Sequence, residues 1–382
     1  MMRRNKIKRK KRVKKMIKFG KWVVKFRIPI LILSFLLLIP TGIIYMNTRI
    51  NYDILSYLPG DIETMKGQDI LLDEFGTGAF SVAVIDGMQE KEISQLEDKL
   101  KEIDHVKDVL WYGALADISI PIDMLPDDLK DSLQNADTGS QLMIITFDTS
   151  MSADETLDAI EEIRGLTNEQ CLLSGMSAVV TDIKKICNSE VIMYVVIAAG
   201  LSALVLALTM DSFLLPFIFL LSIGMAIVYN LGTNFIAGEI SFVTQALAAV
   251  LQLAVTMDYS IFLWHSYLEN QERYPDDKKR AMSHAISQTL TSVVGSSITT
   301  IAGFLAMCFM TFTLGMDLGI VMAKGVVFGV IGCVTILPAM ILAMDKWIEK
   351  TRHKAIIPDL GRIGGFVTKH YWIFIILFLV II

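Results

Sequence analysis

Seven long apolar stretches dominate this chain of 382 residues and restrict what it can fold into. Each is close to the ~20 mostly apolar residues that an α-helix needs to cross a bilayer. Hydrophobic residues make up 53% of the chain and the mean hydropathy is +0.52, too apolar for a soluble protein of this length. The sequence therefore predicts a polytopic α-helical membrane protein with about seven spans. The stretches are roughly Ile28–Met46, Val191–Met210, Phe213–Phe235, Ser241–Trp264, His284–Phe312, Leu318–Met344 and Phe366–Ile382.

Charge is divided unevenly along the chain and indicates its orientation. Residues 3–27 contain fourteen Lys or Arg and no acid, whereas residues 47–188 contain 28 of the 40 acids and only ten Lys or Arg. Because Lys and Arg accumulate on the cytoplasmic side of a membrane, we expect a multi-pass protein of the cell membrane with a cytoplasmic N-terminus. The basic tail could instead bind nucleic acid, but it directly precedes a span, so contact with anionic membrane lipids is favoured.

The acidic segment contains two strand–helix–strand patterns, which suggest a split α+β module of the ferredoxin-like kind outside the membrane. Its expected strands are 79–85, 106–111, 141–147 and 170–173, with helices over 91–103 and 152–166. The whole chain is then expected to comprise a basic cytoplasmic tail (1–27), a first span (28–46), the outer domain (47–188), a block of spans two to six (189–344), a cytoplasmic linker (345–365) and the start of a seventh span (366–382).

One carboxyl group lies deep inside the fourth apolar stretch. Asp258, followed by Tyr259, is the one Asp, Glu, Lys or Arg between Ile240 and Tyr267. An ionisable group at this depth costs at least ~2.5–3.5 kcal/mol and by default marks a functional site. Burial disfavours the charged form of a carboxyl group, so Asp258 could take up and release protons near neutral pH. The alternative interpretation is a neutral Asp258 that hydrogen-bonds a neighbouring helix.

The fifth apolar stretch offers a partner for Asp258. Ser292, Ser296, Thr299 and Thr300 recur at helical spacing. Small residues let helices approach closely, and their hydroxyls can form hydrogen bonds between helices. We therefore expect this polar stripe to pack against the fourth span near Asp258.

Three further polar residues are candidate accessories. Lys324, the second charge inside a span, either extends toward the outer interface or pairs with Asp317. His265 lies at the inner end of the fourth span and could receive protons from the cytoplasm, although an interfacial histidine is the more ordinary interpretation. Gln252 either lines a polar track or bonds one span to another.

Several catalytic signatures do not occur in the sequence. It contains no phosphate-binding loop, no nucleophile elbow and no His/Cys cluster at metal-ligand spacing. The chain is therefore expected not to be an enzyme, and to use no cofactor and no metal.

With these residues placed, the chain resembles the resistance-nodulation-division (RND) superfamily, specifically its MMPL branch. The resemblance covers essentially residues 20–382. It rests on the Asp258-Tyr259 pair, on the order of one span, one large outer domain and five spans, and on two segments that look like the family, Ser260-Ile261-Phe262-Leu263 and Thr335-Ile336-Leu337-Pro338-Ala339. It implies that the outer domain is a porter domain and that Asp258 and Tyr259 form the proton relay.

In that family the whole unit is repeated, and a second Asp-Tyr pair works with the first. This sequence ends in what would be the seventh span. We therefore expect the N-terminal half of such a transporter, either a fragment or a truncated product, whose partner is the missing C-terminal half or another subunit.

The expected function is proton-motive-force-driven export of a hydrophobic or amphipathic substrate such as a lipid or a drug. Two alternatives stay open. Five spans around a polar centre also resemble a sterol-sensing arrangement, which would make the chain a lipid-binding sensor or scaffold. The same broad architecture is shared by protein-export accessories similar to SecD and SecF.

Overall fold

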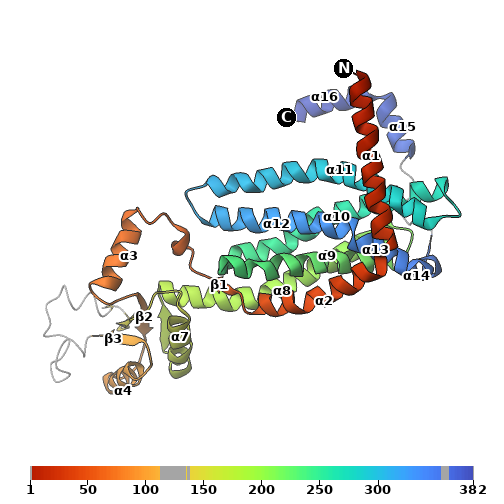
Figure 1. Ribbon diagram of the computed structural model, residues 1–382. Helices are drawn as coiled ribbons and strands as arrows, with labels where there is room; N and C mark the ends of the chain where they lie inside the picture. The colour runs from red at the N-terminus through yellow and green to blue at the C-terminus, as the bar shows by residue number, and fades with distance from the viewer. Residues whose placement is uncertain (1, 112–134, 136–137, 354–360, 382) are drawn as a thin grey trace.

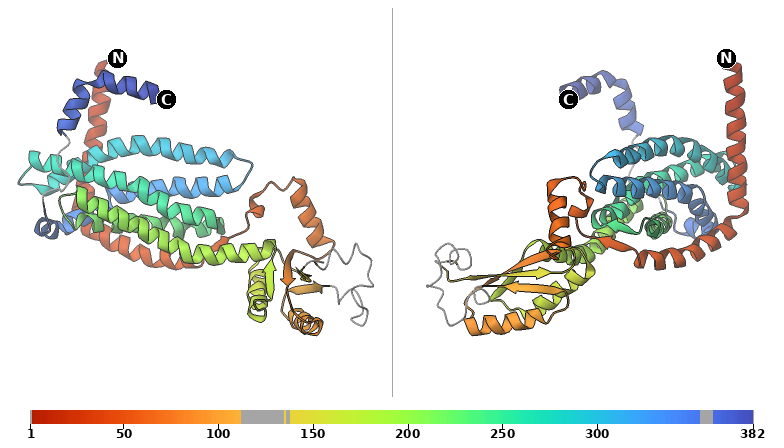
Figure 2. Two further views of the ribbon diagram at one scale, coloured as in Figure 1. Left: turned by 180° about the vertical axis from the view of Figure 1, so that it is seen from behind. Right: turned by 60° about the vertical axis from the view of Figure 1, so that its left-hand side comes forward.

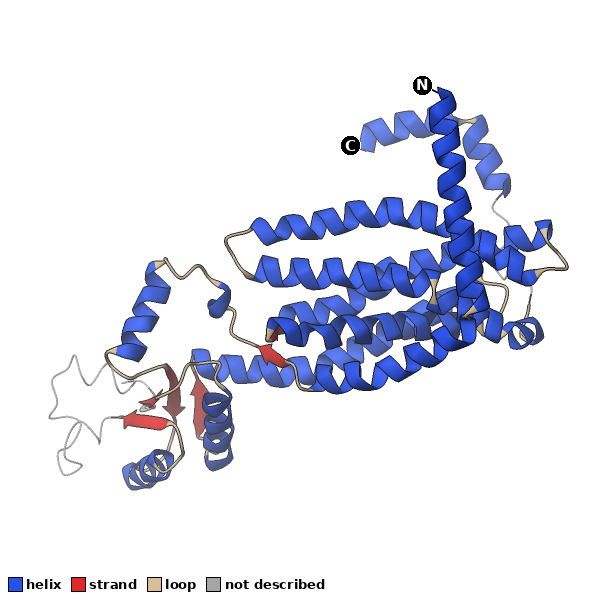
Figure 3. Cartoon of the chain, in the orientation of Figure 1, coloured by secondary structure: helices blue, strands red, loops and turns tan. Residues whose placement is uncertain are grey.

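The structure is a computed structural model that describes residues 2–111, 135, 138–353 and 361–381. It consists of a helical bundle and a smaller sheet unit beyond one end of the bundle (Figure 1). Both chain termini lie toward the opposite end (Figure 2). Among these residues, strands occur only in the sheet unit and where it joins the bundle (Figure 3). We call the two ends of the bundle the sheet end and the far end.

Six helical segments among the described residues are long and apolar enough to cross a membrane, so the chain is a polytopic membrane protein. The seventh expected stretch contains two short helices instead of one span. Helix α15 (Gly361–Lys369) includes residue 365, where the cytoplasmic linker was expected to end, and α16 (Tyr371–Ile381) is shorter than a span. The spans are formed by α2 (Arg27–Met46), α8 (Met176–Thr209), α9 (Leu215–Gly232), α10 (Phe242–Arg273), α11 (Lys278–Ala306) with η4 (Met307–Phe309), and α12 (Leu314–Val334) with α13 (Ile336–Ala343).

Helices α9 and α12 lie at the centre of the bundle. Their most apolar windows are 67% and 61% buried, against 6–11% for α2, α8 and α11, whose outer faces are left for lipid. Close contact between α9 and α2 depends on Gly232, where an added Cβ would lie only 2.3 Å from the carbonyl oxygen of Thr41. The Tyr229 hydroxyl, on the same helix, donates to the Ser34 carbonyl at 2.6 Å. These contacts fix the first span against the centre of the bundle.

The sheet unit contains two interleaved strand–helix–strand halves, close to the elements expected from the sequence. Its four strands lie in the order β3-β4-β2-β5, and every neighbouring pair is antiparallel. Both helices pack their apolar residues on the same face of the sheet. The elements are β2 (Ala79–Ile85), α4 (Glu90–Lys101), β3 (Val106–Leu110), β4 (Gln141–Phe147), α7 (Asp154–Leu166) and β5 (Cys171–Ser174).

A small second sheet joins the chain after the first span to the start of the fourth. Strand β1 (Arg49–Asn51) pairs in parallel with β6 (Glu239–Ser241). The Asn51 amide also donates to the Glu239 carboxylate at 3.0 Å. Strands of three residues carry too little periodicity to be recognised in sequence. The short helices around this junction are η1 (Leu55–Tyr57), α3 (Glu63–Asp73) and η3 (Thr233–Ala237).

Helix α8 runs without interruption from the sheet unit into the bundle. The sequence placed a boundary near residue 188, which in the structure lies inside this 34-residue helix. Its first turns bind the sheet unit: the Ser177 hydroxyl donates to the Phe80 carbonyl at 3.2 Å, and Asp182 accepts two bonds, of 2.6 and 2.9 Å, from Arg164 of α7. A continuous helix therefore connects the sheet unit to a membrane span.

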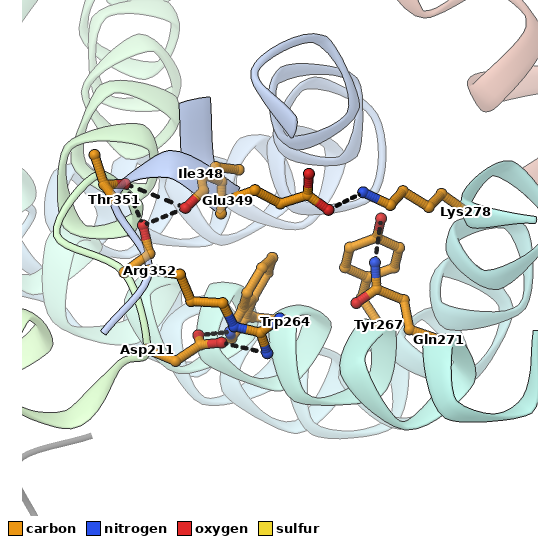
Figure 4. Close-up of polar contacts among 10 residues, drawn as sticks. Asp211, Trp264, Tyr267, Gln271, Lys278, Ile348, Glu349, Thr351 and Arg352 are labelled. Atoms are coloured by element: carbon orange, nitrogen blue, oxygen red, sulfur yellow. Dashed lines mark hydrogen bonds and ion pairs between the residues drawn. The ribbon is translucent and has the colours of Figure 1, made fainter. Parts of the chain in front are cut away.

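The far end is crossed by α1 (Met2–Lys25), which runs across the direction of the spans (Figure 1). Beside it, polar contacts hold the turn between α8 and α9 against α14 (Asp345–Lys350), as Figure 4 shows. Asp211 pairs with Arg352 at 3.0 Å and accepts a hydrogen bond from the Trp264 indole at 3.0 Å, while Ser212 bonds Thr351 at 2.7 Å. Four helices are thus joined at this end.

Candidate functional site

Asp258 lies near the midpoint of the 32-residue helix α10, on the face that the bundle leaves open. Its side chain is exposed, and so are Leu251 and Phe262 one or two turns away. Within the described part of the chain, no hydrogen bond or ion pair reaches its carboxylate. These three residues therefore share a face of α10 that no described helix covers.

Tyr259 points the other way, into the bundle. It is 7% exposed, and its hydroxyl accepts a hydrogen bond of 3.1 Å from Ser297 of α11. Its carbonyl oxygen accepts a bond of 3.2 Å from the Cys333 thiol of α12. Successive residues differ by about 100° around a helix, so one member of the pair faces the open side while the other joins three helices.

The predicted polar stripe on α11 does not pack against α10, so this expectation was wrong. A neighbouring face of α11, which carries Ser297, makes the contact instead. Ser292, Ser296 and Thr299 are exposed and Thr300 is half-buried. The Ser296 and Thr299 hydroxyls donate to carbonyls three residues earlier, at 3.1 and 2.7 Å, and Thr300 donates to the Ser296 carbonyl at 3.2 Å. Hydroxyls bonded within their own helix need no partner on a neighbour.

The stripe nevertheless lies at the same depth as the acid. Tyr259 bonds Ser297, so Asp258 and Ser296 next to them in sequence lie within about one helical turn of the same level on two neighbouring helices. Both are exposed. The residues of α11 that do face the bundle at this level are Val293 and Ser297, each 3% exposed.

Gln252 belongs to a polar cluster buried between α9, α10 and α12. It is 2% exposed, and its carbonyl oxygen accepts a hydrogen bond of 3.0 Å from the Asn230 amide. Glycines make room for the cluster: a Cβ at Gly325 would lie 2.7 Å from the Asn230 amide nitrogen, and one at Gly329 would lie 2.5 Å from the Thr256 hydroxyl. Here Gln252 bonds one span to another.

The Gln252 amide nitrogen, the Asn230 carbonyl oxygen and the Thr256 hydroxyl are all buried, and none has a hydrogen-bond partner among the residues that the structure describes. Buried polar groups are rarely left unpaired, because each costs roughly 1–3 kcal/mol. The cluster is therefore suited to holding bound water in the centre of the bundle.

Lys324 reaches toward the sheet end, and its ammonium group donates to the Asn234 carbonyl oxygen. No ion pair joins it to Asp317 in the described residues, so the suggested pairing is not observed, and extension toward the outer interface stays a prediction. Asp317 instead accepts hydrogen bonds from the Ser241 backbone at 2.9 Å and from the Thr244 hydroxyl at 2.6 Å.

Lys324 and Asp317 line the same cavity, which has a volume of about 470 Å³. Apolar side chains such as Met316 and Ile320 form much of its wall, and Glu239 adds a second carboxylate. Tyr57, in the segment that follows the first span, forms one side of the cavity. Burial, with Asp317 and then Glu239 nearby, raises the pKa of the Tyr57 hydroxyl well above its ordinary range, so this wall stays neutral. The cavity combines opposite charges with apolar surface, and sequence reasoning missed it because its lining comes from three separated segments, 56–57, 233–239 and 313–324.

His265 is exposed on the same face of α10 as Asp258, two turns nearer the far end. No hydrogen bond or ion pair to it occurs among the described residues. The same residues contain no group of three or more His, Cys, Asp or Glu side chains that could hold a metal ion.

The chain is a polytopic membrane protein with a polar site in its spans. It has six apolar spans in the described part of the chain, a sheet unit inserted between the first two, and a carboxyl group near the middle of the fourth. The model of the MMPL family matches residues 76–370, about three quarters of the chain, and the chain belongs to this family.

Two curated relatives are matched over only part of their length. "Probable transport protein MmpL12" of Mycobacterium tuberculosis is 24% identical over 299 residues, covering 74% of this chain and 24% of that protein. SCO5905 of Streptomyces coelicolor, named only as a membrane protein, is 25% identical over 239 residues, covering 60% of this chain and 28% of its own length. The chain thus spans about a quarter of the length of these relatives.

Among solved structures, SecDF of Thermus thermophilus, described as a translocon-associated membrane protein, is similar with a TM-score of 0.45 and 14% identity. The likeness covers 86% of this chain and 38% of SecDF.

Proposed function

We propose that this chain is one unit of a proton-driven RND-type transporter that exports a hydrophobic or amphipathic substrate, and that Asp258 takes up and releases the proton. The observation that carries the proposal is an unpaired carboxyl group exposed at mid-depth of a membrane span. Exposure to hydrocarbon would cost at least ~2.5–3.5 kcal/mol. In the assembled transporter, another membrane-embedded unit, either a C-terminal half or another subunit, therefore covers this face.

The neighbouring residues then have distinct roles. Tyr259 positions α10 by its contacts to α11 and α12, so it fixes where the carboxyl group lies. The exposed hydroxyls of Ser296 and Thr299 lie near the level of Asp258 and supply groups through which a proton can pass once the face is covered. His265 on the same face extends this path toward the far end.

Substrate chemistry is supported by the cavity at the sheet end. An amphipathic molecule can place a polar group against Lys324, Asp317 and Glu239 and its apolar part against Met316 and Ile320. We infer that the sheet unit is a ferredoxin-like porter domain, which its strand order and helix placement support. The basic N-terminus supports a cytoplasmic far end and an outer sheet end.

The test replaces Asp258 by Asn in the chromosomal gene and profiles amphipathic compounds outside the cells. We expect Asp258→Asn to lose the same compounds as a gene deletion while reaching the membrane at normal levels. Glu269→Gln, which removes an exposed carboxylate from the same helix, should leave the profile unchanged. Normal export by Asp258→Asn would remove the relay proposal, and a deletion that alters only protein secretion would favour a protein-export accessory.

A further inference from the structure

A second cavity, of about 540 Å³, lies at the far end between the last turns of α1 and the start of α11. Five of the residues that line it are cations and one is an acid, Asp277. The five cations are Lys21, Lys25, Arg27, Lys279 and Arg280. The cavity takes no part in the proton path or in the cavity at the sheet end.

The positive charge of this basic cavity is not neutralised by the protein. None of its five cations forms an ion pair with a carboxylate in the part of the chain that the structure describes. The Asp277 carboxylate accepts a hydrogen bond of 2.9 Å from the Arg280 backbone and so caps α11. Lys278 differs from its neighbours, because it pairs with Asp345 at 2.7 Å and with Glu349.

Aromatic rings and close helix packing hold the basic cavity in shape. The Arg280 guanidinium lies over the Tyr274 ring, 4.4 Å from its centroid, and the Lys25 ammonium lies 5.4 Å from the Phe26 centroid. Helices α1 and α11 meet at Gly20, where a Cβ would lie 2.4 Å from the Ser283 carbonyl oxygen. Two walls of the cavity are therefore fixed relative to each other.

The basic cavity also lies at the level where lipid head groups are found. One span begins at Arg27 and another at Lys278, both at the edge of the cavity. On α1, Trp22 is 51% exposed and Phe26 is 38% exposed. Aromatic residues of this kind gather at the membrane–water interface. Helix α1, which crosses the far end in Figure 1, is thus placed to lie along the membrane surface.

We propose that the basic cavity binds the phosphate-bearing head group of an anionic phospholipid and thereby docks α1 on the membrane. Basic pockets between spans on the cytoplasmic side bind anionic head groups. Arg and Lys form short, charge-assisted hydrogen bonds to phosphate oxygens. A lipid is favoured over a soluble phosphate because both walls of the cavity continue into membrane spans. The inference does not depend on the transport proposal.

The test titrates the full chain in detergent with phosphatidylglycerol and follows bound lipid by native mass spectrometry. The cavity variant combines Lys21→Gln, Lys25→Gln, Lys279→Gln and Arg280→Gln, all at exposed positions. The control variant removes the same charge from exposed positions outside the cavity at the same end, by Lys14→Gln, Lys15→Gln, Lys18→Gln and Lys346→Gln. Each cation near an anionic surface contributes about fivefold in affinity. We therefore expect the cavity variant to bind about 600-fold more weakly, and the control to lose less than about tenfold.

Equal weakening of the two variants would overturn the proposal, because it would show general charge attraction rather than a site. Glycerol phosphate that binds as tightly as the lipid, or a short DNA oligonucleotide that binds more tightly, would overturn it as well. Phosphatidylcholine is expected to bind both variants equally weakly. If the fourfold variant does not fold, the pair Lys21→Gln and Lys25→Gln on α1 is expected to bind about 25-fold more weakly, and an unchanged affinity would again contradict the site.

Discussion

At the residue scale, two adjacent side chains divide the work of the site. Asp258 faces the open side of α10, whereas Tyr259 is buried and bonded. The partner helix contact was not predictable, because Ser296 and Ser297 are the same residue type and differ only in the direction in which α11 presents them.

This difference between neighbouring serines gives a direct prediction. Ser297→Ala removes the hydrogen bond to Tyr259 and should lower the stability of the bundle by roughly 0.6 kcal/mol, the average for such bonds between spans. Ser296→Ala removes a bond within its own helix at an exposed position and should change stability by less than about 0.3 kcal/mol. Thermal unfolding in detergent measures both, and a larger loss for Ser296→Ala would show that the stripe faces the bundle after all.

At the element scale, helix α9 depends on glycine where it meets α2. Gly232→Ala would place a Cβ 2.3 Å from the Thr41 carbonyl oxygen, which is backbone and cannot move aside alone. We expect a loss of roughly 1–3 kcal/mol from this overpacking. Gly224 lies two turns earlier in the same helix with open space around it, so Gly224→Ala should be neutral or stabilise by up to ~1 kcal/mol. Chemical unfolding of both variants tests the contact, which would be refuted if they behaved alike.

A second prediction at this scale concerns coupling between the sheet unit and the bundle through helix α8. Ser189 is exposed in the stretch between the sheet unit and the membrane, and Ser189→Pro removes a backbone hydrogen bond and kinks the helix at a cost of about 3 kcal/mol. If α8 carries motion between the two units, this variant should fold and reach the membrane but lose export, while Ser189→Ala should export normally. Normal export by the proline variant would show that a continuous α8 is not required.

Folding of the sheet unit in the proline variant can be followed at Cys171. This thiol is 3% exposed, and burial raises its pKa, so it stays protonated and unreactive toward maleimide while the unit is folded. Protection of Cys171 in Ser189→Pro, read by mass spectrometry of the labelled peptide, separates a loss of coupling from a loss of fold.

At the scale of the whole molecule, the described residues leave two surfaces open. One is the face of α10 and α11 that carries Asp258 and the polar stripe, and the other is the face of the sheet that its helices leave uncovered. On that sheet face, Phe80, Leu110 and Leu172 are 49%, 41% and 65% exposed. Exposed apolar surface of this kind marks sites of protein contact. Both surfaces agree with a chain that works as one unit of a larger assembly.

The sequence predicted the large-scale order well, because apolar runs of span length and alternating strands leave strong periodic signals. It did not reveal the cavity lined by Lys324 and Asp317 or the basic cavity, since each is assembled from segments far apart in the chain. Gln252 is an example of what a sequence alone cannot predict. Its position inside the fourth span was predictable, whereas its partner Asn230 on another helix was not.

The central claim, that Asp258 carries the proton, is tested most directly by proton flux. The protein, purified from native membranes with its co-purifying subunits, is reconstituted into vesicles that enclose a pH-sensitive dye, and decay of an imposed pH gradient is followed. We predict that Asp258→Asn reduces the protein-dependent flux to the level of empty vesicles, whereas Glu269→Gln leaves it unchanged. A flux in Asp258→Asn equal to that of the unaltered protein would contradict the account.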